Sequence, residues 1–297
     1  MLVFVTGASG FVGSAVVKEL IEAGHEVLGL ARSEASAKTL REAGAALHIG
    51  SLDDLESLKA GAAAADGVIH TAFIHDFSNY KENCEVDRRA IQAMGEALAG
   101  TDKPLVITSG TALVISNPIS NERDQPNVSA DIVPRVASEE AAAAMAAKGV
   151  NVRVVRLPPS THGTGDYGFV PMLANIAKEK GEAVYVGDGL NLWPAAHRFD
   201  AARLYRLVLE RGTAATTYHA VAEQGVTMRD IATLIGKKLG LPVVSKNEEE
   251  AAAYFGWMTH FAGMNVPSSS QITRDALSWE PSGLGLLEDI EQNYFNS

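Results

Sequence analysis

The 297-residue chain has a single cysteine, Cys84, and few basic residues for its size. One thiol can form no internal disulfide and supplies no cysteine-based metal site. Lys and Arg number 25 against 36 Asp and Glu, which gives a formal net charge of −11. Without a dense basic cluster, this balance argues against a nucleic-acid partner. No run of 18 apolar residues occurs, and no basic segment precedes a long apolar stretch near the start. We therefore expect no membrane span and no signal peptide, and a cytoplasmic location.

Short apolar runs alternate with helical patterns through the first half of the chain. Hydrophobic residues make up 46% and charged residues 21%, which is ordinary for a folded globular protein and excludes a disordered chain. The alternation predicts an α/β fold with a doubly wound parallel sheet and helices on both faces. Strands are expected at 2–6, 26–31, 45–49, 67–70, 103–108 and 151–157, and helices near 12–23, 33–43, 53–59, 80–99 and 136–147.

Three glycines at a spacing of three follow the first expected strand and open the first expected helix. Gly7 permits a sharp turn, Gly10 lets the backbone approach a pyrophosphate, and Gly13 lets the helix pack closely on the strand. The N–H groups of a helix N-terminus favour an anion there. The predicted phosphate-binding residues are Gly7, Ala8, Ser9, Gly10, Phe11, Val12 and Gly13.

The pattern changes after about residue 160. We expect a dinucleotide-binding domain over 1–160 and a smaller, mostly helical substrate-binding lobe over 161–297, with segments that return to the sheet. Within the second part, the sequence predicts a helix at 169–180, a strand at 183–186, a helix capped by Asp200 and a strand near 218–222. The histidines near strand ends lack acids at ligand spacing, so no metal site is expected.

Five segments together resemble the extended and atypical branches of the short-chain dehydrogenase/reductase superfamily, whose members include epimerase/dehydratase-like proteins that bind NAD or NADP. They are Thr6–Gly13, Val68–Ala72, Ile107–Gly110, Arg156–Gly163 and Ala196–Asp200. The resemblance covers about the first 210 residues. It implies a Rossmann fold, a dinucleotide cofactor, a small-molecule substrate and a possible homodimer.

The end of the second strand indicates which dinucleotide is bound. An acidic residue there would favour NAD, but the chain has Arg32 and Ser33, which can bind a 2′-phosphate. NADP is therefore favoured, NAD remains possible, and Arg32 could instead be a solvated residue at a helix start. The further cofactor contacts that the resemblance implies are Leu52, Asp53, Thr71, Ala72, Phe73, Thr108, Leu157 and Pro158.

The usual catalytic set of the superfamily is incomplete here. It consists of a Ser or Thr after the fifth strand and a Tyr-x-x-x-Lys on the next helix. Ser109 and Thr111 are the candidate hydroxyls, while alignment places Gly110 at the usual position. Arg135 stands in place of the tyrosine and Glu139 in place of the lysine. Arginine cannot donate a proton at neutral pH, although it can polarise a carbonyl or bind a carboxylate.

Other side chains could supply the proton or bind the substrate. Tyr167 and His162 are the candidate proton donors, because the resemblance places their loop beside the nicotinamide. His75, Arg135 and Arg198 are the candidate substrate-binding residues. Each of these could also have a purely structural role.

Three functions remain open at this point. The first is an NADP-dependent oxidoreductase acting on a small carbonyl or alcohol. The second is a non-catalytic NADP-binding redox sensor or regulator, which the missing Tyr-x-x-x-Lys would fit. The third and weakest is a sugar-nucleotide epimerase or dehydratase, because those enzymes use the same tyrosine.

Overall fold

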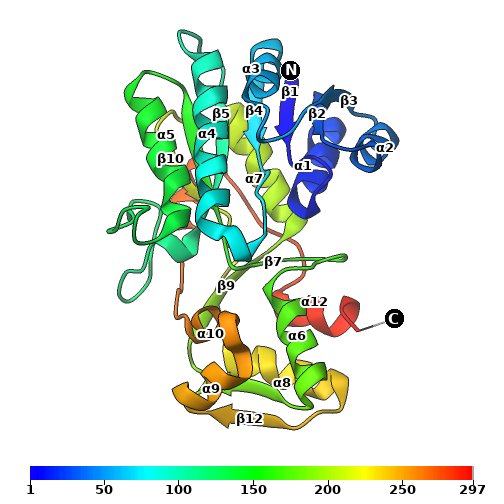
Figure 1. Cartoon of the computed structure of the whole chain (residues 1–297), viewed down its shortest axis with the longest axis vertical. Coiled ribbons are helices and arrows are strands. Elements are labelled where there is room, and N and C mark those ends of the chain that lie inside the picture. Colours follow the sequence, from blue (N-terminus) through cyan, green and yellow to red (C-terminus); the bar gives the residue numbers. More distant parts are fainter. Residues whose placement is uncertain (296–297) are drawn as a thin grey trace.

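A parallel seven-stranded sheet forms the upper half of the molecule in Figure 1, in the order β10-β6-β5-β4-β1-β2-β3. The computed structural model describes residues 1–295. All neighbouring strands of this sheet run parallel, so the doubly wound α/β prediction is confirmed. The strands are β1 (Leu2–Thr6), β2 (Glu26–Ala31), β3 (Ala46–Ile49), β4 (Gly67–His70), β5 (Leu105–Gly110), β6 (Val152–Leu157) and β10 (Thr216–His219).

Helices cover both faces of the sheet because its strands alternate buried side chains between two apolar clusters. Val3 and Val5 of β1 belong to one cluster and Phe4 to the other. Both faces of the sheet are shielded from solvent, which explains why the sequences of these strands are continuous apolar runs. One face is covered by α1 (Phe11–Glu22), α2 (Glu34–Glu42) and α7 (Arg198–Arg211), and the other by α3 (Leu55–Ala64), α4 (Tyr80–Leu98) and α5 (Ala137–Ala147).

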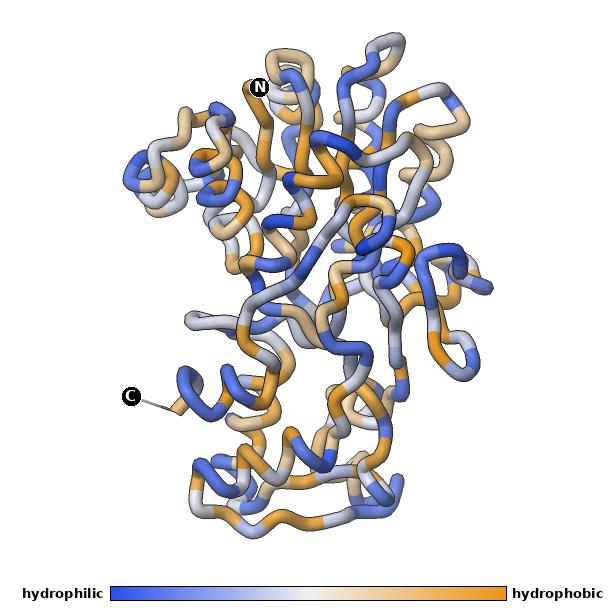
Figure 2. The backbone as a smooth tube through the Cα atoms, turned by 180° about the vertical axis from the view of Figure 1, so that it is seen from behind, coloured by the Kyte–Doolittle hydropathy of each residue, from blue (hydrophilic) through white to orange (hydrophobic). Residues whose placement is uncertain are grey.

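The remaining elements form a lobe beyond the carboxyl ends of the strands, and several chain segments cross between the two parts (Figure 2). Its apolar cluster surrounds the buried Trp193. The strands are β7 (Ser160–His162), β8 (Ala183–Val186), β9 (Leu192–His197), β11 (Glu223–Thr227) and β12 (Val243–Lys246). The helices of the lobe are α6 (Phe169–Lys180), α8 (Met228–Leu239), α9 (Glu248–Phe255), α10 (Thr259–Gly263) and α12 (Leu286–Asn293). The exception is α11 (Gln271–Leu277), which returns to the sheet half and packs against α7 and β10. Short 3₁₀ turns are η1 (Phe77–Asn79), η2 (Thr111–Leu113), η3 (Pro134–Val136) and η4 (Gly256–Met258).

The prediction that Asp200 caps α7 is wrong. The cap is His197, whose Nδ1 accepts the N–H of Phe199. Asp200 lies in the first turn, and its carboxylate accepts the backbone N–H groups of Ser282 and Gly283 at 2.9 and 2.8 Å. The carboxylate thus binds a distant segment of the tail and, on its own helix, the side chain of Arg203 at 2.8 Å, but it caps no backbone N–H of α7. The third helix also begins later than expected, after the cap Asp54.

The segment that Asp200 holds places a tryptophan in the core of the sheet domain. Trp279 is 1% exposed and packs in the same cluster as α1 and α7. Its indole N–H donates to the carbonyl oxygen of Asp200 at 3.0 Å. The tail therefore stabilises the sheet half of the molecule, although it is far away in sequence.

We expect Trp279→Ala to lower the free energy of unfolding by about 3–5 kcal/mol, because it leaves a large cavity beside α7. Trp257→Ala is the matched control, since Trp257 is 56% exposed. Urea unfolding followed by circular dichroism measures both. Equal losses for the two variants would contradict a core role for the tail.

Candidate functional site

The glycine loop between β1 and α1 is shaped for an anion. Gly7 adopts a φ of +66°, and a Cβ there would lie 2.6 Å from the backbone nitrogen of Ala72. A Cβ on Gly13 would lie 2.0 Å from the carbonyl oxygen of Gly7. No side chain caps the start of α1, and its first turn has no acidic residue. The N–H groups of that turn are therefore available to a phosphate, so the residues present fit a dinucleotide.

The end of β2 presents one cation to the solvent. Arg32 is exposed, and within residues 1–295 it has no carboxylate partner. The hydroxyl of Ser33 caps α2 by accepting the N–H of Ser36 at 3.2 Å. Arg32 is therefore the side chain at this position that is free to meet a phosphate. Leu52 is buried and Asp53 exposed after β3.

The ends of β4, β5 and β6 lie side by side, and they bring the remaining predicted cofactor residues to one edge of the sheet. Those residues are Thr71, Ala72 and Phe73 after β4, Thr108 on β5, and Leu157 and Pro158 at the end of β6. Thr71 donates its hydroxyl to the carbonyl oxygen of Thr6 at 2.8 Å, and Thr108 donates to that of His70 at 2.7 Å.

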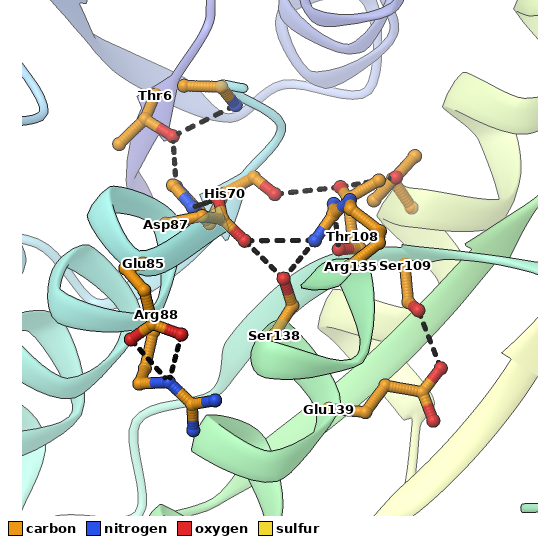
Figure 3. Close-up of polar contacts among 12 residues, drawn as sticks. Thr6, His70, Glu85, Asp87, Arg88, Thr108, Ser109, Arg135, Ser138 and Glu139 are labelled. Atoms are coloured by element: carbon orange, nitrogen blue, oxygen red, sulfur yellow. Dashed lines mark hydrogen bonds and ion pairs between the residues drawn. The ribbon is translucent and has the colours of Figure 1, made fainter. Parts of the chain in front are cut away.

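A buried carboxylate, Asp87 of α4, lies at the centre of a polar network behind this edge (Figure 3). One oxygen accepts from His70 Nε2 at 2.9 Å, and His70 Nδ1 meets the hydroxyl of Thr6 at 2.6 Å. The other oxygen accepts from Arg135 at 3.1 Å and from Ser138. Burial alone would raise the pKa of Asp87, but the charge of Arg135 and these hydrogen bonds outweigh it and hold the pKa below its usual value.

A second buried ion pair occupies the position of the missing lysine. The carboxylate of Glu139 accepts hydrogen bonds from both Nε and Nη2 of Arg156, at 2.8 and 2.7 Å. It also accepts the hydroxyl of Ser109 at 2.5 Å. The hydroxyl of Thr111 is buried and has no partner in the described part of the chain. The two residues that replace the catalytic tyrosine and lysine are thus each paired with an opposite charge: Arg135 with Asp87, and Glu139 with Arg156.

The loop over 163–168 is held against the start of α1. Arg198 donates to the carbonyl oxygen of Thr164 at 3.1 Å and to Ser14 at 3.3 Å, and its guanidinium lies 4.7 Å from the ring centre of Phe11. Tyr167, 59% exposed, meets the same ring edge-on at 6.0 Å. The structure therefore brings Tyr167 and Arg198 to the glycine loop.

His162 is placed differently from Tyr167. Its Nδ1 pairs with Asp289 of α12 at 2.7 Å, and both side chains are buried. Across residues 1–295 it shares no hydrogen bond or ring contact with Ser109, Thr111 or Arg135. The structure does not join His162 to the candidate hydroxyls.

Sequence reasoning missed Asp87, Ser138 and Arg156. A signal for Asp87 was present: it lies four residues before Ile91 on the apolar stripe of α4 that continues to Met94 and Leu98. An acid on such a stripe needs a buried partner. Arg156 similarly interrupts the apolar strand β6.

Within residues 1–295, no group of three His, Cys, Asp or Glu side chains is arranged to hold a metal ion. Among the described helices, none combines the length and apolar character needed to cross a bilayer.

The chain belongs to the NAD dependent epimerase/dehydratase family, whose model matches residues 3–221. This confirms the resemblance to the extended short-chain dehydrogenase/reductases. An uncharacterised protein of Schizosaccharomyces pombe, C2A9.02, is 49% identical over 99% of this chain and 100% of its own length. The sterol-4-alpha-carboxylate 3-dehydrogenase (decarboxylating) of Dictyostelium discoideum is 25% identical over 80% of this chain and 76% of its own.

Among solved structures, the dTDP-glucose 4,6-dehydratase DesIV of Streptomyces venezuelae has a similar fold, with a TM-score of 0.77. The match covers 99% of this chain and 95% of that one at 20% identity.

Asp87→Asn should lower the free energy of unfolding by about 3 kcal/mol, because it leaves Arg135 without its buried counter-charge and weakens the hydrogen bond to His70. Asp102→Asn is the control: that carboxylate is exposed and has no ion pair in the described chain, so its loss should stay below about 0.5 kcal/mol. Chemical denaturation measures both. A loss no larger than the control's would show that the network does not stabilise the fold.

The same carboxylate predicts a pH dependence. Since the folded pKa of Asp87 is lowered, its stabilisation is complete above the unfolded pKa of about 3.9 and is lost as pH falls through the folded value. Unfolding curves between pH 2 and 6 should show a steeper acid loss for the wild type than for Asp87→Asn. Parallel pH curves for the two proteins would argue against this assignment.

Proposed function

We propose that the protein is an oxidoreductase that uses NADP in preference to NAD and acts on the carbonyl or alcohol group of a small molecule. The observation that carries the NADP preference is Arg32, exposed and without a carboxylate partner at the end of β2, where an acid would select NAD. The family match and the dehydrogenase relative support the oxidoreductase class.

The chain's own residues divide the binding of the dinucleotide between them. The uncapped start of α1 would take the pyrophosphate, Arg32 the 2′-phosphate, and the edge residues after β4, β5 and β6 the nicotinamide half. When bound, the cofactor supplies hydride chemistry. Tyr167 and Arg198 lie at the glycine loop, where they would cover the bound nucleotide and exclude water.

The substrate would meet a fixed cation rather than a tyrosine. Arg135 is held by Asp87 and by the carbonyl oxygen of Thr108, so it can polarise a substrate oxygen without moving. The hydroxyl of Ser109 is donated to Glu139, so donation to a substrate requires release of that bond. In the described chain His162 keeps Nε2 without a partner, but its side chain is fully buried and is not joined to the candidate hydroxyls. A sugar-nucleotide epimerase or dehydratase is disfavoured, because the candidate basic residues for a second nucleotide, Arg198 and Arg203, are already bonded to Thr164 and Asp200.

A second candidate is a protein that binds NADP without turnover. It is favoured by the two ion pairs, Arg135 with Asp87 and Glu139 with Arg156, which occupy the positions of the catalytic tyrosine and lysine. Such a protein would report the NADP redox state to a partner.

Arg32→Ala should weaken NADPH binding about 10- to 100-fold and leave NADH binding unchanged, because a charge-assisted hydrogen bond contributes roughly 1.5–3 kcal/mol. Arg41→Ala, on the neighbouring helix and paired with Glu34, is the matched control and should bind like the wild type. Fluorescence titration measures each affinity. Equal wild-type affinity for NADPH and NADH would refute the NADP preference.

Turnover separates the two candidates. We expect the purified chain to oxidise NADPH with at least one member of an aldehyde, ketone and enone panel, or to reduce NADP with an alcohol. Absorbance at the nicotinamide band follows the reaction. Tight NADPH binding with no turnover across the panel would reject the enzyme and favour the sensor.

A further inference from the structure

The ring of Phe73, just after β4, contacts three polar side chains. The guanidinium of Arg135 lies over its face, 4.4 Å from the ring centre. The rings of His75 and Tyr80 meet it edge-on at 5.2 and 6.2 Å. We call Phe73, His75, Tyr80 and Arg135 the Phe73 cluster. It lies beyond the carboxyl end of β4, at the sheet edge where the family places its chemistry.

Arg135 is fixed and still has donors to offer. A guanidinium carries five N–H groups. In the described chain three of them are used, by Asp87, Ser138 and the carbonyl oxygen of Thr108. The side chain is 15% exposed. Arg135 thus combines a permanent charge, a locked orientation and spare donors, which is what an oxyanion requires of its binding group.

His75 is the base within this cluster. The residue is exposed, yet partial desolvation of its ring and the charge of Arg135 lower its pKa, although the backbone of Phe73 and the charge of Asp87 act in the opposite direction. The nearby phenol and thiol cannot act as the base at neutral pH, because burial raises the pKa of Tyr80 to about 12 and that of Cys84 to about 11, so both keep their own protons. Asp76, the next residue, accepts both the N–H and the hydroxyl of Ser78, which lower its pKa.

We propose that Arg135 and His75 together replace the missing tyrosine: Arg135 binds the substrate oxygen as it gains negative charge, and His75 exchanges the proton of that oxygen. The inference rests on the proposed function. In alcohol oxidation, the O–H bond breaks, its proton goes to the unprotonated imidazole nitrogen, and its electron pair becomes the second bond of the carbonyl. The carbon that bears this oxygen is oxidised, because it loses a hydride to the oxidised nicotinamide that the proposed function supplies. Reduction is the reverse, with the proton returned from His75.

The direction of the pH dependence follows. Oxidation needs neutral His75, so its rate should be level at neutral pH and fall as pH drops through the lowered pKa. Reduction needs the protonated imidazole, so its rate should rise as pH falls. The charged groups that set this behaviour are Arg135 on η3, which lowers the pKa of His75, and Asp87 on α4, which raises it.

The first test needs no cofactor. Histidine side-chain NMR follows the titration of His75, whose resonance is assigned by its disappearance in His75→Gln. We expect a wild-type pKa below the ordinary value and a shift upward in Arg135→Met, because the neighbouring positive charge is removed. Arg41→Met is the matched control and should leave the titration unchanged. An unchanged His75 titration in Arg135→Met would overturn the pairing.

A second variant guards against loss of the fold. Arg135→Lys keeps a charge beside Asp87 but removes the planar donors, so His75 should keep its low pKa while turnover falls. His75→Gln should lower turnover by about 10²- to 10⁴-fold, remove the pH dependence and leave NADPH affinity unchanged. Wild-type turnover and pH profile in His75→Gln would overturn this proposal alone. Nucleotide binding without any wild-type turnover would overturn the proposed function, and the catalytic role with it.

Discussion

The buried carboxylate of Asp87 is the interaction on which the site depends. It joins four parts of the chain: the end of β4 through His70, the end of β1 through the bond of His70 to Thr6, helix α4 itself, and the segment of η3 and the start of α5 through Arg135 and Ser138. A buried charge is tolerated only when its lone pairs are satisfied, and here both oxygens are. The glycine loop, which follows β1, and the Phe73 cluster, which follows β4, are therefore both held in place by one carboxylate. A shift at the end of either strand would change the position of both.

The two departures from the usual catalytic set are linked by charge. A cation in place of tyrosine needs an acid, which Asp87 supplies, and an acid in place of lysine needs a cation, which Arg156 supplies. Neither replacement would be stable without its partner, since each would leave an uncompensated charge in a buried place. The site is thus a different, internally balanced arrangement of the same positions, rather than the family site with parts removed.

Short apolar runs, helical periodicity and the spacing of three glycines were enough to predict the parallel sheet, its helices and the glycine loop, because each depends on neighbours in sequence. Contacts between distant segments were not accessible in that way. Asp200 looks like a helix cap locally, yet it binds Ser282 and Gly283. Strands β9 and β11 were missed because they are stabilised by pairing with each other across some 30 residues rather than by a pattern of their own. Asp87 was detectable as an acid on an apolar stripe, but its partners were not.

The position of β10 has a consequence for how the chain is made. This strand completes one edge of the sheet beside β6, but some 60 residues, most of them in the lobe, separate the two. Trp279, later still, closes the core against α7. A nascent chain that has emerged only as far as β6 has therefore an open sheet edge and an uncovered apolar face. The core against α7 can therefore close only after Trp279 has left the ribosome, so the sheet half depends on a segment made after most of the lobe.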